Sequence, residues 1–166
     1  MAKKENKTNA MRILETLQIP FEAHTYECDE FIDGIQIADM LGLPHDKVFK
    51  TLVTQGASKN YFVFVIPIAE ELDMKAAARS VGEKAVELIP VKAITPLTGY
   101  IRGGCTPLGM KKAFPTVIHS SALDFEEIII SGGRIGAQIL LHPRDLVRVT
   151  GARVAPIIRT NEEEPL

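Results

Sequence analysis

The amino-acid sequence predicts an α/β (α+β) fold, a single domain whose mixed, partly barrel-like β-sheet is surrounded by short helices. Short apolar strands alternate with short helices, and no internal repeat recurs at the roughly 20–50-residue periods of solenoid proteins. No linker is long enough to divide the chain, and its 166 residues, 46% of them hydrophobic, suffice to bury one core. We expect one domain over residues 1–166, with its core at about 10–158 and frayed ends at 1–7 and 160–166.

In the first half of the chain, apolar residues at helical spacing predict three helices. The first begins at Thr8 and Asn9 and ends before Pro20, the second runs from Gly34 to Gly42, and the third follows Asp73 and ends at Gly82. A single helical turn is expected at 44–46. Strands are predicted at 21–26, 48–53, 61–66 and 85–89, with a turn-rich segment at 55–60.

The second half repeats this alternation. A helix is predicted from Val91 to Leu97, running into Gly99, and residues 101–115 are irregular because they are rich in glycine and proline. Strands are predicted at 115–119, 125–130, 138–141 and 152–155, with a helix at 142–149 between the last two.

Several classes of protein are excluded by composition. Cys28 and Cys105 are too few for a disulfide framework. The longest apolar run, residues 62–69, is far shorter than a bilayer span, and the polar N-terminus lacks the apolar segment of a secretory signal. We therefore expect a soluble cytoplasmic protein that does not contact a membrane.

Charge is distributed unevenly along the chain. Residues 101–160 have a net charge of +4, whereas residues 1–100 and the tail 161–166 each have −3, which gives the chain its −2. This basic second half would suit a polyanion, although an ordinary fluctuation in charge explains it equally well. It is less basic than a dedicated DNA-binding domain, so we expect no DNA partner.

The common motifs for phosphate, dinucleotide and serine-hydrolase sites are missing from the sequence. Its four histidines are scattered, and on a strand His24 and Cys28 would lie about 13 Å apart. We therefore expect neither a metal site nor a cofactor.

Three segments carry unusual chemistry, and each has two interpretations. Lys50 interrupts the apolar strand at 48–53, so it either extends from a strand edge or points into a polar cleft. The glycine-rich segment 99–109 is either a structural loop or a backbone cradle for an oxyanion. Residues 131–136 suit a third element of a site or a plain hairpin turn.

Together these segments resemble the YbaK/EbsC family, whose members are similar to the editing domain of bacterial prolyl-tRNA synthetases. The resemblance covers roughly residues 10–158. It is carried by His24-Thr25-Tyr26, Val48-Phe49-Lys50-Thr51-Leu52, Gly99-Tyr100, the GG-x-[ST]-P-x-G-x-KK pattern of residues 103–112, and Ser131-Gly132-Gly133 followed by Gly136.

The resemblance implies trans-editing of Cys-tRNA(Pro), and it assigns roles to individual residues. Lys50 is implied to be the catalytic side chain. The residues implied to bind the aminoacyl group are Tyr26, Thr51, Gly103, Gly104, Thr106, Pro107 and Gln138. The basic residues Arg102, Lys111, Lys112 and Arg134 are expected to contact tRNA, although a solvated helix start explains Lys111 and Lys112 as well. Prolyl-tRNA synthetase is the implied protein partner.

The family's proposed route is substrate-assisted: the cysteine thiol attacks its own ester carbonyl and leaves as a thiolactone. Two departures from the better-known branch affect specificity. Asp33 precedes Gly34 where that branch has an aromatic residue, and Gln138 replaces an aspartate. Two alternatives therefore stay open: a non-catalytic tRNA-binding module of the same fold, and a deacylase for another small residue such as alanine or serine.

Overall fold

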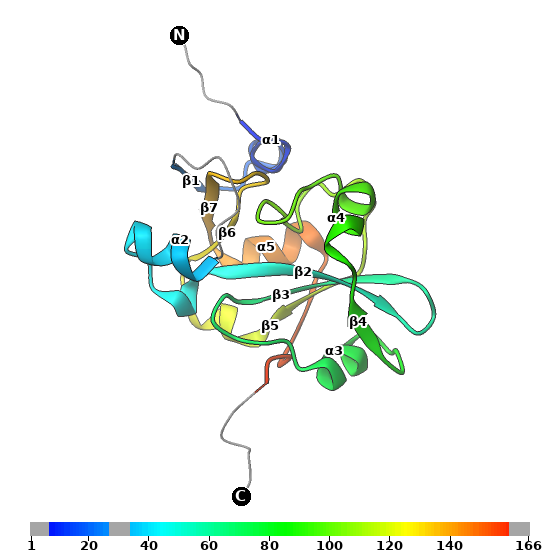
Figure 1. The fold of residues 1–166 in the computed structure, drawn as a ribbon. Coiled ribbons are helices and arrows are strands. Elements are labelled where there is room, and N and C mark those ends of the chain that lie inside the picture. Colours follow the sequence, from blue (N-terminus) through cyan, green and yellow to red (C-terminus); the bar gives the residue numbers. More distant parts are fainter. Residues whose placement is uncertain (1–6, 27–33, 160–166) are drawn as a thin grey trace, which may run out of the picture.

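The computed structural model describes residues 7–26 and 34–159, and Figure 1 shows the arrangement of the elements. The described helices are α1 (Asn9–Thr16), α2 (Gly34–Leu41), η1 (His45–Lys47), α3 (Met74–Ser80), α4 (Val91–Thr98), η2 (Ser120–Asp124) and α5 (Pro143–Thr150). The strands are β1 (Glu22–Thr25), β2 (Phe49–Gly56), β3 (Tyr61–Pro67), β4 (Val86–Leu88), β5 (Thr116–His119), β6 (Ile128–Ser131), β7 (Ala137–Leu141) and β8 (Arg153–Ala155). The predicted order of helices and strands is confirmed.

The strands form two sheets. One is antiparallel, with the order β1-β7-β6, and the other is mixed, with the order β4-β2-β3-β5-β8, in which β5 runs parallel to β3 and β8. A bridge between Val48, which directly precedes β2, and Ile129 of β6 connects the two sheets, so the smaller sheet adjoins the start of β2 (Figure 1). The predicted fold class is confirmed, and the single curved sheet expected from the sequence is divided at this bridge.

Helices α1 and α3 begin where the sequence supplies a side-chain cap. The Thr8 hydroxyl accepts a hydrogen bond from the Met11 N–H at 3.2 Å, and Asp73 accepts bonds from the N–H groups of Lys75 and Ala76 at 3.1 Å each. Such bonds satisfy amide groups that the first helical turn leaves without partners. Both predicted helix starts are confirmed.

Two clusters of buried side chains lie on opposite faces of β3. Val63 and Val65 belong to the cluster that also contains Leu14 of α1 and Ile139 of β7, whereas Phe64 belongs to the cluster with α3. Because consecutive strand residues point to opposite faces, burial on both sides requires the continuous apolar run seen in the sequence. This double burial fixes β3 and its neighbour β2 in the centre of the molecule.

Some boundaries differ from the prediction. β2 extends through Gln55 to Gly56 because β3 and β4 both pair with this end of the strand, which outweighs its turn-forming composition. Residues 120–124 form η2, so β6 begins at Ile128 rather than at Phe125.

The expected frayed ends lie outside the described residues, except for Lys7, which pairs with Glu15 at 2.9 Å. No helix within the described ranges is long and apolar enough to cross a membrane.

Candidate functional site

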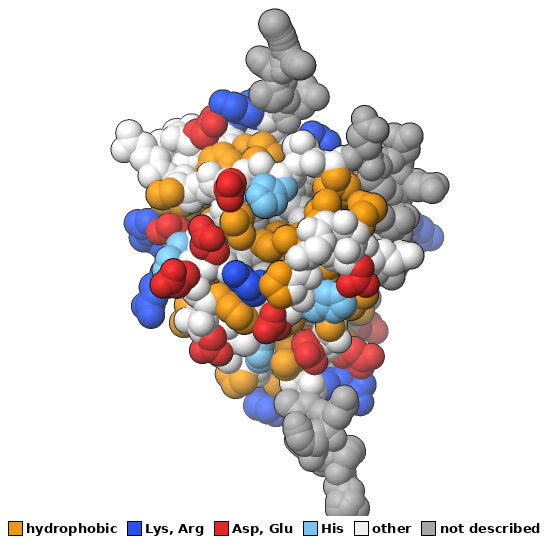
Figure 2. Space-filling model, turned by 90° about the vertical axis from the view of Figure 1, so that its left-hand side faces the viewer, with side chains coloured by type: hydrophobic (Ala, Val, Ile, Leu, Met, Phe, Trp, Pro, Cys, Tyr) orange, Lys and Arg blue, Asp and Glu red, His pale blue; other side chains and the backbone are white. Residues whose placement is uncertain are grey.

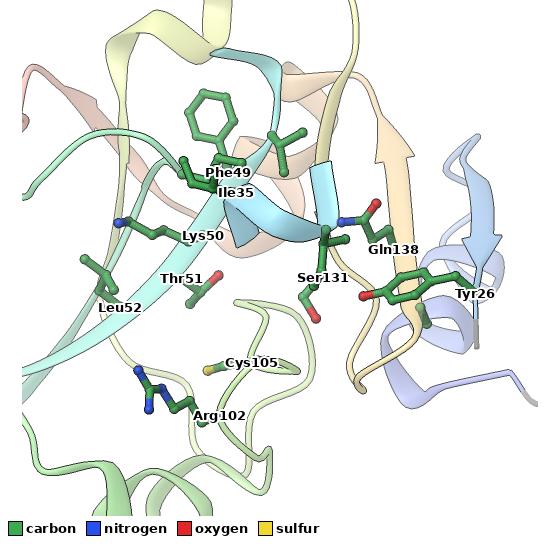
Figure 3. Close-up of a pocket in the computed structure, with 15 residues that line it drawn as sticks. Tyr26, Ile35, Phe49, Lys50, Thr51, Leu52, Arg102, Cys105, Ser131 and Gln138 are labelled. Atoms are coloured by element: carbon green, nitrogen blue, oxygen red, sulfur yellow. The ribbon is translucent and has the colours of Figure 1, made fainter. Parts of the chain in front are cut away.

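A cavity of about 430 Å³ lies beside the first half of β2 (Figure 3). Four consecutive residues of β2, 49–52, line it. Because consecutive residues of a strand point to opposite faces, a cavity that contacts all four runs along the edge of the strand. That edge is available because β4 pairs only with Thr54–Gly56, beyond the cavity. The sheet topology therefore creates the hollow.

Six of the residues proposed from the sequence line this cavity. They are Tyr26, Lys50, Thr51, Arg102, Gly103 and Gln138. They come from segments far apart in the chain: the end of β1, the strand β2, the glycine-rich loop after α4, and the strand β7. Ser131 of the segment 131–136 lines the cavity as well, so the fold brings together the three segments that the sequence singled out.

Both interpretations of Lys50 describe part of its environment. The residue is half-buried and pairs across the sheet with Ile66 of β3. It lies on the part of β2 whose other edge, opposite β3, borders the cavity. Figure 3 shows its ammonium group on the same side of the cavity as the Arg102 guanidinium. Among the described residues that line the cavity, these two carry charge and none is acidic. The cavity wall therefore favours ligand atoms with negative charge.

The glycine-rich loop is held by internal hydrogen bonds. The buried Tyr100 hydroxyl donates to the Leu108 carbonyl, and the Gly104 N–H donates to the Ile101 carbonyl at 2.9 Å. Burial raises the pKa of Tyr100 to about 12, so this phenol remains a protonated donor even at alkaline pH. Gly103 has a φ of +88°, a conformation that favours glycine. The loop is therefore a fixed wall of the cavity.

The segment 131–136 is a hairpin connection and also part of the site. It joins the antiparallel strands β6 and β7, and Ser131 at its start lines the cavity. A Cβ atom on Gly104 would lie 2.8 Å from Cα of Arg134, so the glycine loop and the hairpin meet backbone to backbone. The two glycine-rich segments support each other through this contact.

The other proposed residues do not line the cavity. Thr106 is fully buried, and its hydroxyl is without a partner among the described residues. The Lys111 ammonium donates to the Pro96 carbonyl at 3.0 Å, near the end of α4, where a cation is favourable. Lys112 is exposed, Pro107 is half-buried, and an Arg134 Nη1 donates to its neighbour's carbonyl at 3.2 Å. The proposed roles of these residues in binding the aminoacyl group or tRNA remain predictions.

Sequence reasoning missed the apolar wall of the cavity. Ile35 and Ile37 from α2 line it, together with Val48 and Ile68. In the sequence they look like any other core residues, because nothing in an apolar side chain distinguishes a cavity wall from a packed interior. Asp33 and Cys28 lie outside the described residues.

The described ranges contain no candidate metal site, because no group of three His, Cys, Asp or Glu side chains there could hold a metal ion.

Figure 2 shows the side of the molecule that lies on the left in Figure 1. Acidic and apolar side chains are spread across it, and basic ones lie mainly toward its margins.

Cys105 lines the cavity but is a protonated thiol. Burial raises its pKa to about 12, against a smaller lowering by its hydrogen bond with Thr98. Compared with the ordinary value of 9.0, this lowers the thiolate fraction about a thousandfold. We expect iodoacetamide at pH 8 to alkylate Cys105 about 10³-fold more slowly in the folded than in the denatured protein. Mass spectrometry of a Cys28→Ser variant measures this, and equal rates would contradict the burial argument.

Comparisons with known proteins agree on one family. The family model described as "Aminoacyl-tRNA editing domain" matches residues 34–149. An Enterococcus faecalis protein named "Putative Cys-tRNA(Pro)/Cys-tRNA(Cys) deacylase EbsC" is 41% identical over 160 residues, which cover 95% of this chain and 98% of that protein.

Two crystal structures share the fold. That of a hypothetical protein has a TM-score of 0.82 at 24% identity and covers 89% of this chain and 97% of its own. That of "a putative trans-editing enzyme for prolyl tRNA synthetase" has a TM-score of 0.76 at 23% identity, with coverage of 93% and 100%.

Proposed function

The chain belongs to the aminoacyl-tRNA editing domain family, and on that basis we propose that it is a trans-editing deacylase that removes cysteine from Cys-tRNA(Pro). The observation that carries the proposal is the cavity at the edge of β2, where Lys50, Arg102 and the glycine loop meet. An aminoacyl ester is already activated, so a site that binds it and stabilises negative charge needs neither a serine triad nor a metal.

Lys50 is the proposed catalytic side chain. Its ammonium group contacts the terminal phosphate or ribose, or stabilises the negative charge that develops on the ester. Arg102 lies on the same side of the cavity and adds a second cation (Figure 3). Tyr26, Thr51 and Gly103 surround the aminoacyl group in this proposal, with Gly104, Thr106 and Pro107 supporting the loop beside it.

The proposed nucleophile comes from the substrate. The cysteine thiol forms a bond to its own carbonyl carbon, the bond to the ribose oxygen breaks, and the thiol proton ends on that oxygen, which leaves a thiolactone and free tRNA. Intramolecular attack gains effective molarity that a bound water lacks. Two nearby cations also favour the thiolate form of the substrate, which is the more nucleophilic one.

A panel of mischarged tRNAs tests this function. We expect the purified protein to release free tRNA from Cys-tRNA(Pro) and to act more than about 200-fold more slowly on Ala-tRNA(Pro) and Ser-tRNA(Pro). The pocket alone separates similar small residues only about 10–200-fold, but alanine also lacks the attacking thiol and the serine hydroxyl is a weaker nucleophile. Faster release from alanine or serine esters would assign the site to another small residue. Detection of free cysteine without thiolactone would replace the thiol route with hydrolysis by water.

The second candidate is a tRNA-binding module without turnover, and the observation that favours it is Gln138, which supplies no carboxylate to the cavity. Saturable tRNA binding without deacylation of any mischarged tRNA, at enzyme concentrations above that of the substrate, would support this candidate.

Partners and organisation follow from the proposed reaction. Lys111 and Lys112 follow the glycine-rich segment 99–109, Arg134 lies on segment 131–136, and we propose that all three contact the acceptor stem. We propose that a transient complex with prolyl-tRNA synthetase in the cytoplasm supplies the recognition of tRNA identity. We further propose that the chain acts as one editing domain, since side chains from both sheets share a buried cluster.

A further inference from the structure

Gln138 is a buried amide at the wall of the cavity. It lies on β7, the central strand of the smaller sheet, and pairs with His24 of β1 on one side and Ser131 of β6 on the other. The residue is 7% exposed. Because both edges of β7 are paired, the backbone that carries this side chain is held in place before any ligand enters.

The amide of Gln138 makes no hydrogen bond within the described part of the chain. Its Oε1 atom is fully buried without a partner, and no described residue accepts from its Nε2 atom. Figure 3 shows the nitrogen turned toward the cavity interior and the oxygen away from it. A buried amide without partners costs free energy, and proteins leave few such groups. An amide N–H at the cavity wall is therefore positioned to pair with a ligand atom.

The surroundings of this amide select the kind of ligand atom. An amide nitrogen only donates, so its partner must be an acceptor. The titratable groups that pair with its strand or line the same cavity are His24 and Tyr26 on the β1 side, Cys105 on the glycine loop, and Lys50 and Arg102, which Figure 3 shows across the cavity from it. Among the described lining residues the charged ones are both cations. The cavity therefore favours an acceptor that carries negative charge.

We propose, building on the deacylase function, that Gln138 is a catalytic residue whose Nε2–H donates to the oxyanion formed on the ester carbonyl. When a thiol or a water attacks the carbonyl carbon, one bond to carbon forms and the C=O π pair moves onto oxygen. When the intermediate collapses, the C=O bond re-forms and the bond to the ribose oxygen breaks, and that oxygen takes the proton of the nucleophile. The amide donor stabilises the intermediate more than the uncharged ester, so it raises kcat.

Gln138→Glu tests the donor directly, because glutamate has nearly the same shape. An ionised carboxylate cannot donate, whereas a protonated carboxyl can. At pH 7.5 we expect kcat on Cys-tRNA(Pro) to fall about 10²–10³-fold, with KM changed by no more than about threefold. As the pH falls toward the carboxyl pKa, ordinarily about 4.3, the ratio of variant to wild-type kcat should rise. Every other titratable group is the same in both proteins, so the ratio isolates the introduced carboxyl.

Two further variants make the test decisive. Gln138→Leu, which suits a buried position, should lose kcat to a similar degree without recovery at low pH. Ser121→Ala removes another buried and unpartnered oxygen, at a residue of η2 that does not line the cavity, and should leave kcat unchanged. Thermal unfolding of each variant verifies that it is folded.

Each outcome has one meaning. Wild-type kcat in Gln138→Leu, a loss confined to KM, or a Gln138→Glu loss that does not recover at low pH would overturn the role of Gln138 while leaving the deacylase intact. A wild-type protein that deacylates none of the mischarged tRNAs would instead remove the proposed function itself.

Discussion

Replacing Lys50 with alanine is expected to lower kcat/KM for Cys-tRNA(Pro) about 10²–10³-fold, the range measured when one stabilising group is removed from a developing oxyanion. The effect is large because Lys50 is half-buried at the cavity, where charge interactions are screened less than at the surface. Single-turnover deacylation with enzyme in excess measures the loss without contributions from product release.

Two variants separate the charge of Lys50 from its packing. Lys50→Met keeps most of the aliphatic stem, so it should be as impaired as the alanine variant if the ammonium group matters. Lys75→Ala removes an exposed lysine of α3, outside the cavity lining, and should deacylate at the wild-type rate. Undiminished turnover in Lys50→Met would exclude the ammonium group from the mechanism.

The parts of the site that the sequence reveals are those with unusual local chemistry. A lysine inside an apolar strand is conspicuous because lysine is rarely buried without a partner, and clustered glycines are conspicuous because they allow close backbone approach. Lys50 and Gly103 were identifiable for these reasons, and the structure places both at one cavity. Lys111 was conspicuous as well, but its contact with the end of α4 depends on where the chain returns after the loop.

Other features depend on contacts between distant segments. The cavity exists because β4 pairs with only the far end of β2, and strand length alone does not predict which residues pair. The division into two sheets has a similar origin, because an isolated bridge between Val48 and Ile129, and not a ladder of paired residues, connects β2 and β6. Sequence patterns identify the elements well because periodicity is local, whereas sheet edges are set by tertiary structure.

Gly104→Ala is expected to damage both stability and activity, because the backbone of the hairpin leaves no space for a side chain. An added Cβ would lie 2.8 Å from Cα and 3.1 Å from the carbonyl carbon of Arg134. These are backbone atoms of a hairpin fixed by two strands, so the glycine loop must move instead. Overpacking of this kind costs about 1–3 kcal/mol of unfolding free energy, which urea denaturation measures.

The displaced loop also carries Gly103 and Cys105 away from β2, so kcat should fall by more than the folded fraction does. Gly151→Ala is the matched control. It places a side chain at a φ of +68° with nothing within 4 Å, so it should cost about 1–2 kcal/mol from backbone strain and leave kcat unchanged. A Gly104→Ala protein with the stability and turnover of the wild type would show that the contact between the two glycine-rich segments does not hold the cavity in shape.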